Sequence, residues 1–497
     1  MKKHHTPKNN LILNEELLSS SLERYRPYLS ETEFNALLNE ISKPLSIAIR
    51  ANCLKTEPDT IIQQWLKWYG WEIKDIPYYP YGWQIKNADR SISQTIEHRL
   101  GSYYIQDAAS MLPVSMFDFS NSHDKLILDM AASPGGKTTQ IIDLTKDNNF
   151  VIANDSSSSR IQALRVVLEN WGASNIMATN IAGEKFGDWF PEAFDYILLD
   201  APCSMENLRP TASHSIRPTT ENERSRLSMR QMNLLLSAYK ALKPNGQLIY
   251  ATCSLAPEED EFVLEALLNS HSTTCEIEKV NKLDLDAPGL EKFGEKIFHK
   301  SIQNSFRLWP HILSTSGFFA AKISKSDSSI TKQETLPDRP LSSSGLTKLK
   351  SEDLQKLLTW VEINYGFSLD NVLQELELEL FTKKDTFYLI PVKYLDQFNG
   401  FPFSMLGMKL GKYSGDNFML SHEFISRFGS KFENGIMTID DEYLDHWMQG
   451  RDIRSLSDKT WQMGTIVVVK DSRSRILGGG KILSDRIRNL LPQRYVR

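Results

Sequence analysis

Cysteine is scarce in this chain of 497 residues, and long apolar runs are lacking. The four cysteines, Cys53, Cys203, Cys253 and Cys275, are too few and too widely spaced for a disulfide scaffold. No Cys-x-x-Cys pair or Cys/His cluster offers a metal site. No stretch of about 18 apolar residues occurs, and residues 1–10 are not followed by an apolar run. We therefore expect a cytoplasmic protein with no membrane segment and no metal.

An overall excess of basic residues is also lacking. The chain has 57 Lys and Arg against 62 Asp and Glu, which gives a formal net charge of -5. A protein that coats nucleic acid is basic throughout, so any RNA contact must be local here. Residues 470–497 carry eight basic and two acidic residues. This segment is either a solvated surface or a surface that binds phosphate groups. Binding of basic residues to phosphates is favourable because it releases counterions.

Length and patterning divide the chain into three domains and a linker. Residues 1–100 combine a helical pattern with a strand-like run and predict a small α+β domain. Residues 101–324 alternate short apolar strands with amphipathic helices, which predicts a parallel sheet covered on both faces. Residues 325–345 are rich in Ser, Thr, Lys, Asp and Pro and predict a linker before a third domain at 346–497. The predicted strands of the middle domain are 126–129, 150–153, 196–199 and 247–252.

A strand, a loop of small residues and a helix follow one another in residues 126–139, which is typical of a nucleotide-type site. Small residues let the backbone approach a ligand closely, and free N–H groups at a helix start favour polar or negative groups. The loop is Ala131-Ala132-Ser133-Pro134-Gly135-Gly136-Lys137.

Two functions fit this loop, binding of ATP and binding of S-adenosylmethionine. A P-loop ATPase is one alternative, because the loop misses that motif by its first glycine only and strand 196–200 ends in a carboxylate for magnesium. S-adenosylmethionine is favoured, because Ala131 replaces the glycine of the tight turn and Pro134 removes an amide from the phosphate cradle. Asp155, about 20 residues beyond the loop, can accept the ribose hydroxyls of an adenosine.

Two further strands each run into a cysteine. One ends in Asp-Ala-Pro-Cys203-Ser and the other in Ala-Thr-Cys253-Ser. Ligands of open α/β sheets bind at the carboxyl ends of strands, and neighbouring strands lie about 5 Å apart, so both thiols can reach one flat ring if the strands are neighbours. A lone cysteine is more often a small buried apolar residue. Two of them at matching strand ends favour a catalytic pair.

Methylation of a pyrimidine explains a need for thiols. A thiolate that adds to carbon 6 of cytosine makes carbon 5 nucleophilic enough to attack a sulfonium methyl group, and a second base must then take the carbon 5 proton. A free thiol has a pKa of about 8.5, so a nearby positive charge is needed, for which Lys137 is a candidate. Asp200 can hydrogen-bond the base and stabilise charge that develops on attack, and a helix N-cap is its alternative role. Spacing does not say which cysteine attacks.

Both cysteine motifs, together with other segments, resemble the Sun-type (NSUN-like) family of RNA cytosine-5 methyltransferases. The resemblance continues beyond the linker to Arg494 and covers nearly the whole chain. The other segments that carry it are residues 49–55, 104–113, 258–261, 317–321, 406–410 and 450–453.

The resemblance implies a Rossmann-like S-adenosylmethionine-dependent core with a C-terminal PUA-like RNA-binding domain. The implied activity is methylation of carbon 5 of a cytosine in small-subunit (16S) ribosomal RNA, by a monomer. Cys253 then corresponds to the nucleophile and Cys203 to the residue that helps to release the product. Ala131–Lys137 correspond to the lining of the cofactor's methionine and ribose, Asp155 to the ribose contact, and Asp200 to a position between cofactor and base.

The chain departs from the family pattern at two places. Ala182 stands where the family usually has an aspartate at the adenine end of the cofactor. After Ser204, the family's Gly-Glu-Gly is replaced by Met205-Glu-Asn207, and residues 208–212 also differ. One lost hydrogen bond is worth about 1 kcal/mol, too little to abolish turnover. We expect an active enzyme, and an RNA-binding assembly factor without catalysis is the alternative.

Overall fold

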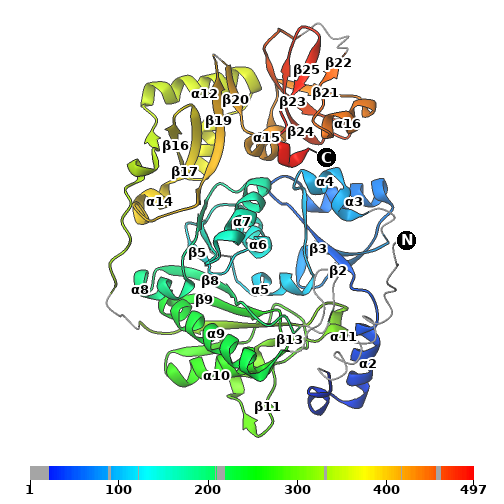
Figure 1. Cartoon of the computed structure of the whole chain (residues 1–497), viewed down its shortest axis with the longest axis vertical. Helices are drawn as coiled ribbons and strands as arrows, with labels where there is room; N and C mark the ends of the chain where they lie inside the picture. Colours follow the sequence, from blue (N-terminus) through cyan, green and yellow to red (C-terminus); the bar gives the residue numbers. More distant parts are fainter. Residues whose placement is uncertain are drawn as a thin grey trace, which may run out of the picture.

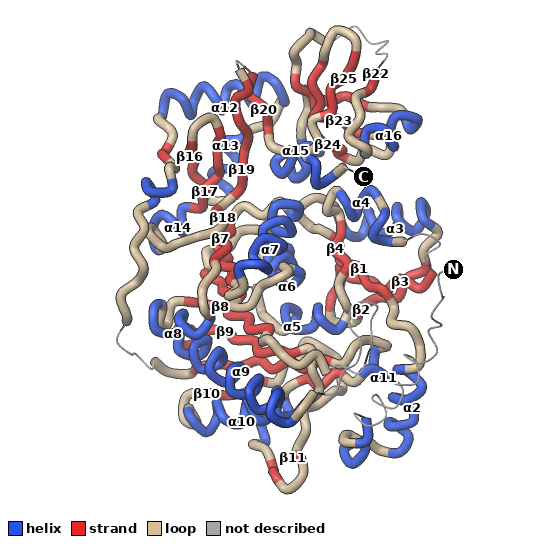
Figure 2. Tube along the Cα trace, viewed as in Figure 1, coloured by secondary structure: helices blue, strands red, loops and turns tan. Residues whose placement is uncertain are grey.

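A nine-stranded sheet lies at the centre of the molecule, with an N-terminal lobe on one side and a C-terminal lobe above (Figure 1). Helices cover the central sheet on both sides, while the two lobes have sheets of their own (Figure 2). The computed structural model describes residues 22–87, 91–120, 122–206, 209, 219–328, 333–415, 417–454 and 461–496.

Five parallel strands form the middle of the central sheet, in the order β9-β8-β5-β6-β7. They include all four strands predicted from the apolar runs, and they confirm the predicted Rossmann-like α/β core. Their bounds are β5 Leu126–Asp129, β6 Phe150–Asn154, β7 Ile176–Thr179, β8 Phe194–Asp200 and β9 Leu242–Thr252.

Both faces of these strands are apolar, which explains their continuous hydrophobic runs. Successive side chains point to opposite faces of a strand. Leu128 and Leu199 therefore pack with α8, α9 and α10, whereas Ile127 and Leu198 pack on the other face with α5, α6 and α7. The helix bounds are α5 Leu112–Ser115, α6 Gly136–Leu144, α7 Ser158–Trp171, α8 Phe186–Trp189, α9 Glu221–Ala241 and α10 Glu261–Ser270.

Antiparallel strands flank the parallel centre at both edges, so the prediction of a parallel sheet is correct for the centre only. β14 (Phe318–Lys325) pairs with β9, and β10 (Cys275–Glu278) and β13 (Phe306–Leu308) pair with β14. At the opposite edge, β18 (Met405–Leu406) pairs with β7. A strand from the C-terminal part of the chain therefore extends the central sheet. Along the chain, three further short elements follow α10 and precede β14. They are β11 Lys292–Phe293, β12 Lys296–Ile297 and α11 Pro310–Leu313.

The N-terminal lobe is a four-stranded antiparallel sheet, in the order β2-β3-β1-β4, with helices packed beside it. Its last strand lies beyond residue 100, so this sheet crosses the boundary placed there from sequence. The bounds are α2 Glu31–Ile41, β1 Ile47–Ala51, α3 Pro58–Tyr69, β2 Glu72–Ile76, β3 Tyr79–Asn87, α4 Ile96–Arg99 and β4 Tyr103–Ile105.

The C-terminal lobe contains two five-stranded sheets. The first has the order β15-β16-β17-β19-β20 and the second β21-β23-β24-β25-β22. The strands are β15 Thr347–Lys348, β16 Leu378–Lys383, β17 Thr386–Pro391, β19 Met408–Ser414, β20 Asn417–Leu420, β21 Ile436–Thr438, β22 Ile453–Arg454, β23 Ile466–Lys470, β24 Ile476–Ile482 and β25 Arg486–Asn489.

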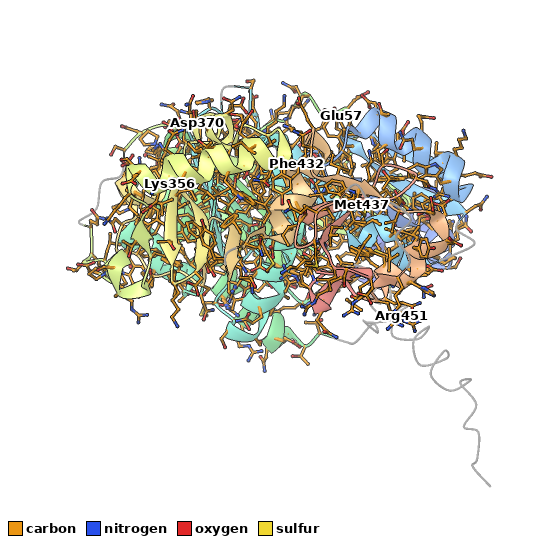
Figure 3. The ribbon with its side chains drawn as sticks, turned by 90° about the horizontal axis from the view of Figure 1, so that it is seen from above. Glu57, Lys356, Asp370, Phe432, Met437 and Arg451 are labelled. Carbon is orange, nitrogen blue, oxygen red and sulfur yellow. The ribbon has the colours of Figure 1, made fainter. Side chains whose placement is uncertain are left out.

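Helices connect and cover these two sheets. Phe432, at the entry to the second sheet, packs on Tyr365 of α12 with ring centroids 4.9 Å apart, and it lies at the end of α12 when the lobe is seen from above (Figure 3). None of the helices that the structure describes is long and apolar enough to cross a membrane. The helices of the lobe are α12 Ser351–Tyr365, α13 Leu369–Glu375, α14 Val392–Gln397, α15 His422–Phe428 and α16 Asp441–Met448.

Candidate active site

Two cysteine sulfurs meet where β8 and β9 end. The strands pair in parallel with Asp200 opposite Ala251, so the chain leaves both at the same edge of the sheet. Sγ of Cys203 and Sγ of Cys253 lie 3.1 Å apart, and both residues are partly exposed. The hydrogen bond to Cys253, together with burial, raises the pKa of the Cys203 thiol well above its usual value. The geometry expected for a thiol pair is therefore present.

A lysine and an aspartate stand beside this pair. Nζ of Lys137 donates a hydrogen bond to Oδ2 of Asp200 at 2.7 Å and lies 5.3 Å from the ring centre of Phe318. Burial alone would lower the pKa of Lys137, but the negative charges of Asp200 and Cys253 outweigh it and raise that pKa. The ammonium form of Lys137 thus stabilises negative charge on both Asp200 and Cys253. Lys137, the positive charge suggested from sequence, thus lies beside Asp200 in this group, and its role in forming a thiolate stays a prediction.

A cavity of about 220 Å³ opens next to this group. The loop that was predicted to hold a cofactor lines it through Ala131, Ala132, Ser133, Pro134, Gly136 and Lys137, and Asp200 lines it as well. Gly135 is not a lining residue, but its φ of 112° at the N-cap of α6 is a conformation that favours glycine. A side chain at Gly136 would lie 3.0 Å from the ring of Tyr104. The two glycines therefore permit the turn and the close contact with β4.

Asp155 and Ala182 lie at the next strand ends but do not line this cavity. The Asp155 carboxylate is buried directly after β6, where it accepts a hydrogen bond from N–H of Ser157 at 2.8 Å and pairs with Arg160 at 3.0 Å. Ala182 is exposed just before a short 3-10 helix at Gly183–Lys185. The hydrogen bonds of Asp155 go to residues shortly after it in the chain and to Asn180, not to the cysteines, and the predicted cofactor contacts of Asp155 and Ala182 remain predictions.

The loop after Cys203 is described only in part. Glu206 accepts hydrogen bonds from the Tyr25 hydroxyl at 2.9 Å and from Arg224 at 2.9 Å, and Arg209 donates to the carbonyl of Lys43 at 2.9 Å. The N-terminal segment and α9 therefore hold this loop. The remaining residues of the altered stretch, Asn207, Leu208 and 210–212, lie outside the described residues.

Several lining residues were not singled out as site residues from sequence. Asp129 ends β5 and accepts a hydrogen bond from Thr138 at Oδ2, while its Oδ1 has no donor among the described residues. Burial raises the pKa of Asp129 to about 7. The other lining residues belong to segment 104–113, one of the segments that carry the family resemblance, so the resemblance could have identified them. This segment contributes Tyr104, Ile105, Gln106, Asp107 and Ser110.

Comparisons with known proteins identify the family of the chain. A family model described as 16S rRNA methyltransferase RsmB/F matches residues 117–324, and one described as the N-terminal domain of 16S rRNA methyltransferase RsmF matches residues 19–108. Ribosomal RNA small subunit methyltransferase F of Aeromonas salmonicida is 31% identical over 480 residues, which cover 95% of this chain and 94% of the relative. The protein of that name from Shewanella woodyi is 31% identical over 490 residues, with 98% and 97% covered.

Solved structures share the fold of the core. A methyltransferase homolog protein from Pyrococcus horikoshii is 30% identical, with a TM-score of 0.53 over 62% of this chain and 99% of its own. The structure of NSun6 from Pyrococcus horikoshii with SFG has a TM-score of 0.51 at 22% identity, over 62% of this chain and 97% of its own. The resemblance inferred from the cysteine motifs is confirmed, and the chain belongs to the RsmB/F family of 16S rRNA methyltransferases.

Proposed function

We propose that this chain transfers a methyl group from S-adenosyl-L-methionine to carbon 5 of a cytosine in small-subunit (16S) ribosomal RNA. The observation that carries the proposal is the 3.1 Å separation of the Cys203 and Cys253 sulfurs at the ends of neighbouring strands. Two thiols serve a reaction that adds a nucleophile to a ring and later removes it. Relatives that span nearly the whole chain and carry the name ribosomal RNA small subunit methyltransferase F support the substrate class.

S-adenosyl-L-methionine is the methyl donor of this family, and the cavity beside Ala131–Lys137 suits it. The small residues of the loop admit a ligand close to the backbone, and the unpartnered Oδ1 of Asp129 offers an acceptor to a positively charged amino group. In our proposal Ala131–Lys137 hold the methionine and ribose, Asp155 holds the ribose, and Ala182 adjoins the adenine end without a hydrogen-bonding group. When bound, the cofactor supplies an electrophilic methyl group on a positively charged sulfur.

Cys253 acts as the nucleophile in this proposal. Its thiolate adds to carbon 6 of the cytosine, which forms a carbon–sulfur bond and moves the ring electrons toward carbon 5. The ammonium of Lys137, whose pKa is raised by Asp200 and Cys253, is the positive charge that this proposal assigns to the site of attack. Asp200, to which Lys137 donates a hydrogen bond at 2.7 Å, accepts a hydrogen bond from the amine of the base and orients the ring, and the ammonium of Lys137 beside it stabilises the negative charge that develops on the ring.

Cys203 acts after the methyl group has been transferred. In the free enzyme the hydrogen bond to Cys253 and burial keep its pKa high, so Cys203 retains its proton. Once the sulfur of Cys253 is bonded to carbon 6, it no longer carries negative charge, and the pKa of Cys203 falls. Cys203 then gives its own proton to water and, as a thiolate, takes the carbon 5 proton. The electrons of the carbon 5–hydrogen bond restore the carbon 5–carbon 6 double bond, the carbon 6–sulfur bond breaks, and Cys253 leaves with the electron pair.

Methyl transfer to unmodified 16S ribosomal RNA tests this proposal. We expect Cys253→Ala to yield no methylated cytosine, and Cys203→Ala to accumulate a protein–RNA adduct that survives denaturation. Equal product from the wild-type protein and Cys253→Ala would contradict the mechanism. RNA binding by the wild-type protein without any methylation would support the alternative, an assembly factor that has lost catalysis.

Contacts with the RNA are proposed for the lobes around the site. Of the eight basic residues in 470–497, Arg475, Arg486 and Arg494 form ion pairs within the protein. Their charges are partly neutralised, so Lys470, Arg473, Lys481 and Arg488 are the better candidates for phosphate contacts. The eighth, Arg497, lies outside the described residues. We propose that the N-terminal lobe and the PUA-like C-terminal lobe orient the RNA, while the central sheet carries the chemistry.

A further inference from the structure

One buried carboxylate touches both cysteine loops. Glu259 lies at the end of a short 3-10 helix, Pro257–Glu259, six residues after Cys253, and it is fully buried. Its Oε2 accepts a hydrogen bond from the backbone N–H of Ser204 at 2.9 Å, and its Oε1 accepts one from the hydroxyl of Ser254 at 3.2 Å. Ser204 and Ser254 are the residues that directly follow the two cysteines.

A glutamine on α9 completes this arrangement. Nε2 of Gln231, whose side chain is buried, donates to Oε2 of Glu259 at 2.9 Å and to the carbonyl of Pro202 at 3.0 Å. Residues on both sides of Cys203 are thereby bonded to one carboxylate–amide pair. The hydroxyls of Ser204 and Ser254 also lie 3.2 Å apart. The two loops are therefore joined through side chains, not only through the strands that lead into them.

The other acidic residues of this segment serve different contacts. Asp260 and Glu261 pair with the buried guanidinium of Arg307, and Glu258 pairs with Arg24. Of the four acidic residues 258–261, all of which the structure describes, Glu259 is the one that bonds the loops of both cysteines. A carboxylate accepts hydrogen bonds only, so it fixes the direction of all three donors around it.

We propose that Glu259 is a positioning residue that holds the sulfurs of Cys203 and Cys253 together, so that both sulfurs can contact one cytosine ring. This inference rests on the proposed function for its catalytic meaning, but the distance between the sulfurs is a property of the free protein. Without the carboxylate, the backbone N–H of Ser204 loses its acceptor, and the amide of Gln231 keeps only the carbonyl of Pro202. The two loops then separate, and both thiols no longer reach the same ring.

Disulfide formation measures the sulfur–sulfur approach directly. Diamide takes two electrons and two protons from a pair of thiols, which forms the sulfur–sulfur bond and reduces the azo group to a hydrazine. The initial rate of Cys203–Cys253 bond formation is followed by mass spectrometry in the full-length protein. Glu259→Gln keeps an acceptor oxygen for Ser204 and Gln231 but loses the charge, whereas Glu259→Ala loses both.

We expect Glu259→Ala to form the disulfide about tenfold more slowly than Glu259→Gln, the factor that roughly one neutral hydrogen bond provides. Glu258→Ala, a carboxylate removed from the same segment, should oxidise at the wild-type rate. Gln231→Leu should slow the reaction as well, and it serves as the second variant if Glu259→Ala does not fold. Equal rates in Glu259→Ala, Glu259→Gln and the wild-type protein would overturn the proposal.

Activity separates positioning from a general loss of structure. In Glu259→Ala, kcat should fall while the affinity for S-adenosylmethionine stays unchanged, because Glu259 is not a lining residue of the cofactor cavity, and Glu259→Gln should restore most of kcat. A loss of cofactor affinity equal to the loss of kcat would contradict the inference. Failure of the proposed function would look different: the wild-type protein would methylate no RNA, while the order of the oxidation rates would still report the role of Glu259.

Discussion

At the scale of the residue, Asp129 is a carboxylate whose ionisation is coupled to its site. It is buried at the end of β5, lines the cofactor cavity and has one oxygen without a donor among the described residues. Burial, which disfavours the charged form, raises its pKa to about 7. Asp129 is therefore neutral below that pH and negative above it. A ligand with positive charge binds the negative form better.

Cofactor affinity should consequently rise with pH around neutrality. S-adenosylmethionine carries positive charge on its sulfur and amino group, so ionised Asp129 favours binding, by about tenfold at most for each pH unit below the pKa. Titration calorimetry at several pH values between about 6 and 8 measures this change. Asp129→Asn cannot ionise and should give a flat profile. A flat profile in the wild-type protein, or an unchanged slope in Asp129→Asn, would contradict the coupling.

At the scale of the element, the first strand of the N-terminal lobe fixes the helix of the cofactor loop. Arg50 of β1 is fully buried, pairs with Asp143 of α6 and donates to the carbonyl of Gly136 at 3.1 Å and to the hydroxyl of Thr139 at 2.6 Å. Its Nε donates to Gln106, a lining residue of the cavity, at 3.2 Å. The N-terminal sheet and the cofactor loop are thus joined through one guanidinium.

Removing this guanidinium should destabilise the protein strongly. Arg50→Met leaves the buried carboxylate of Asp143 without its cation, which costs about 3–5 kcal/mol of the free energy of unfolding. Arg50→Met combined with Asp143→Asn should recover most of that loss, because the amide is neutral and still accepts the hydrogen bond from Trp171. Urea unfolding followed by tryptophan fluorescence compares the three proteins. Equal stability of the single and the double variant would show that the unpaired charge is not the cause.

Sequence patterns predicted the elements with local signals and missed those made by distant pairing. β5 was predicted with its exact observed bounds from its apolar run, and the loop 131–137 and the two cysteines were found because motif and strand end coincide. β18 is two residues long and is a strand only because β7 offers an open edge, where Met405 pairs with Ala178, 227 positions earlier in the chain. Glu259 was read as part of a motif, but its contacts with both loops depend on the folded chain.

At the scale of the whole molecule, the C-terminal lobe is joined to the central sheet, where β18 lies beside β7 (Figure 2). β18 pairs with β7, and Arg427 of α15 pairs with buried Asp147 and donates to the carbonyl of Gly172 at 2.7 Å. Apolar residues of the lobe, among them Phe398, also belong to the core beneath the sheet. The sequence predicted a separate domain beyond a linker and did not predict these contacts between the C-terminal lobe and the central sheet. We propose domain limits that keep 346–497 as a lobe with two sheets, attached to the core by β18 and α15.

Truncation tests this attachment. A chain that ends at residue 345 loses β18 and Arg427, which uncovers the edge of β7 and leaves Asp147 buried without its cation, at a cost of about 3–5 kcal/mol for the charge alone. We expect this chain to aggregate or to lose cofactor binding, because Asp147 lies between α6 and β6, next to the elements that form the cofactor loop. A chain that ends at Phe432 keeps both β18 and Arg427 and should still bind S-adenosylmethionine. Size-exclusion chromatography and calorimetry distinguish the two. Wild-type affinity in a monomeric chain ending at residue 345 would show that the core folds without the lobe, and that its strand and its arginine are dispensable for the cofactor site.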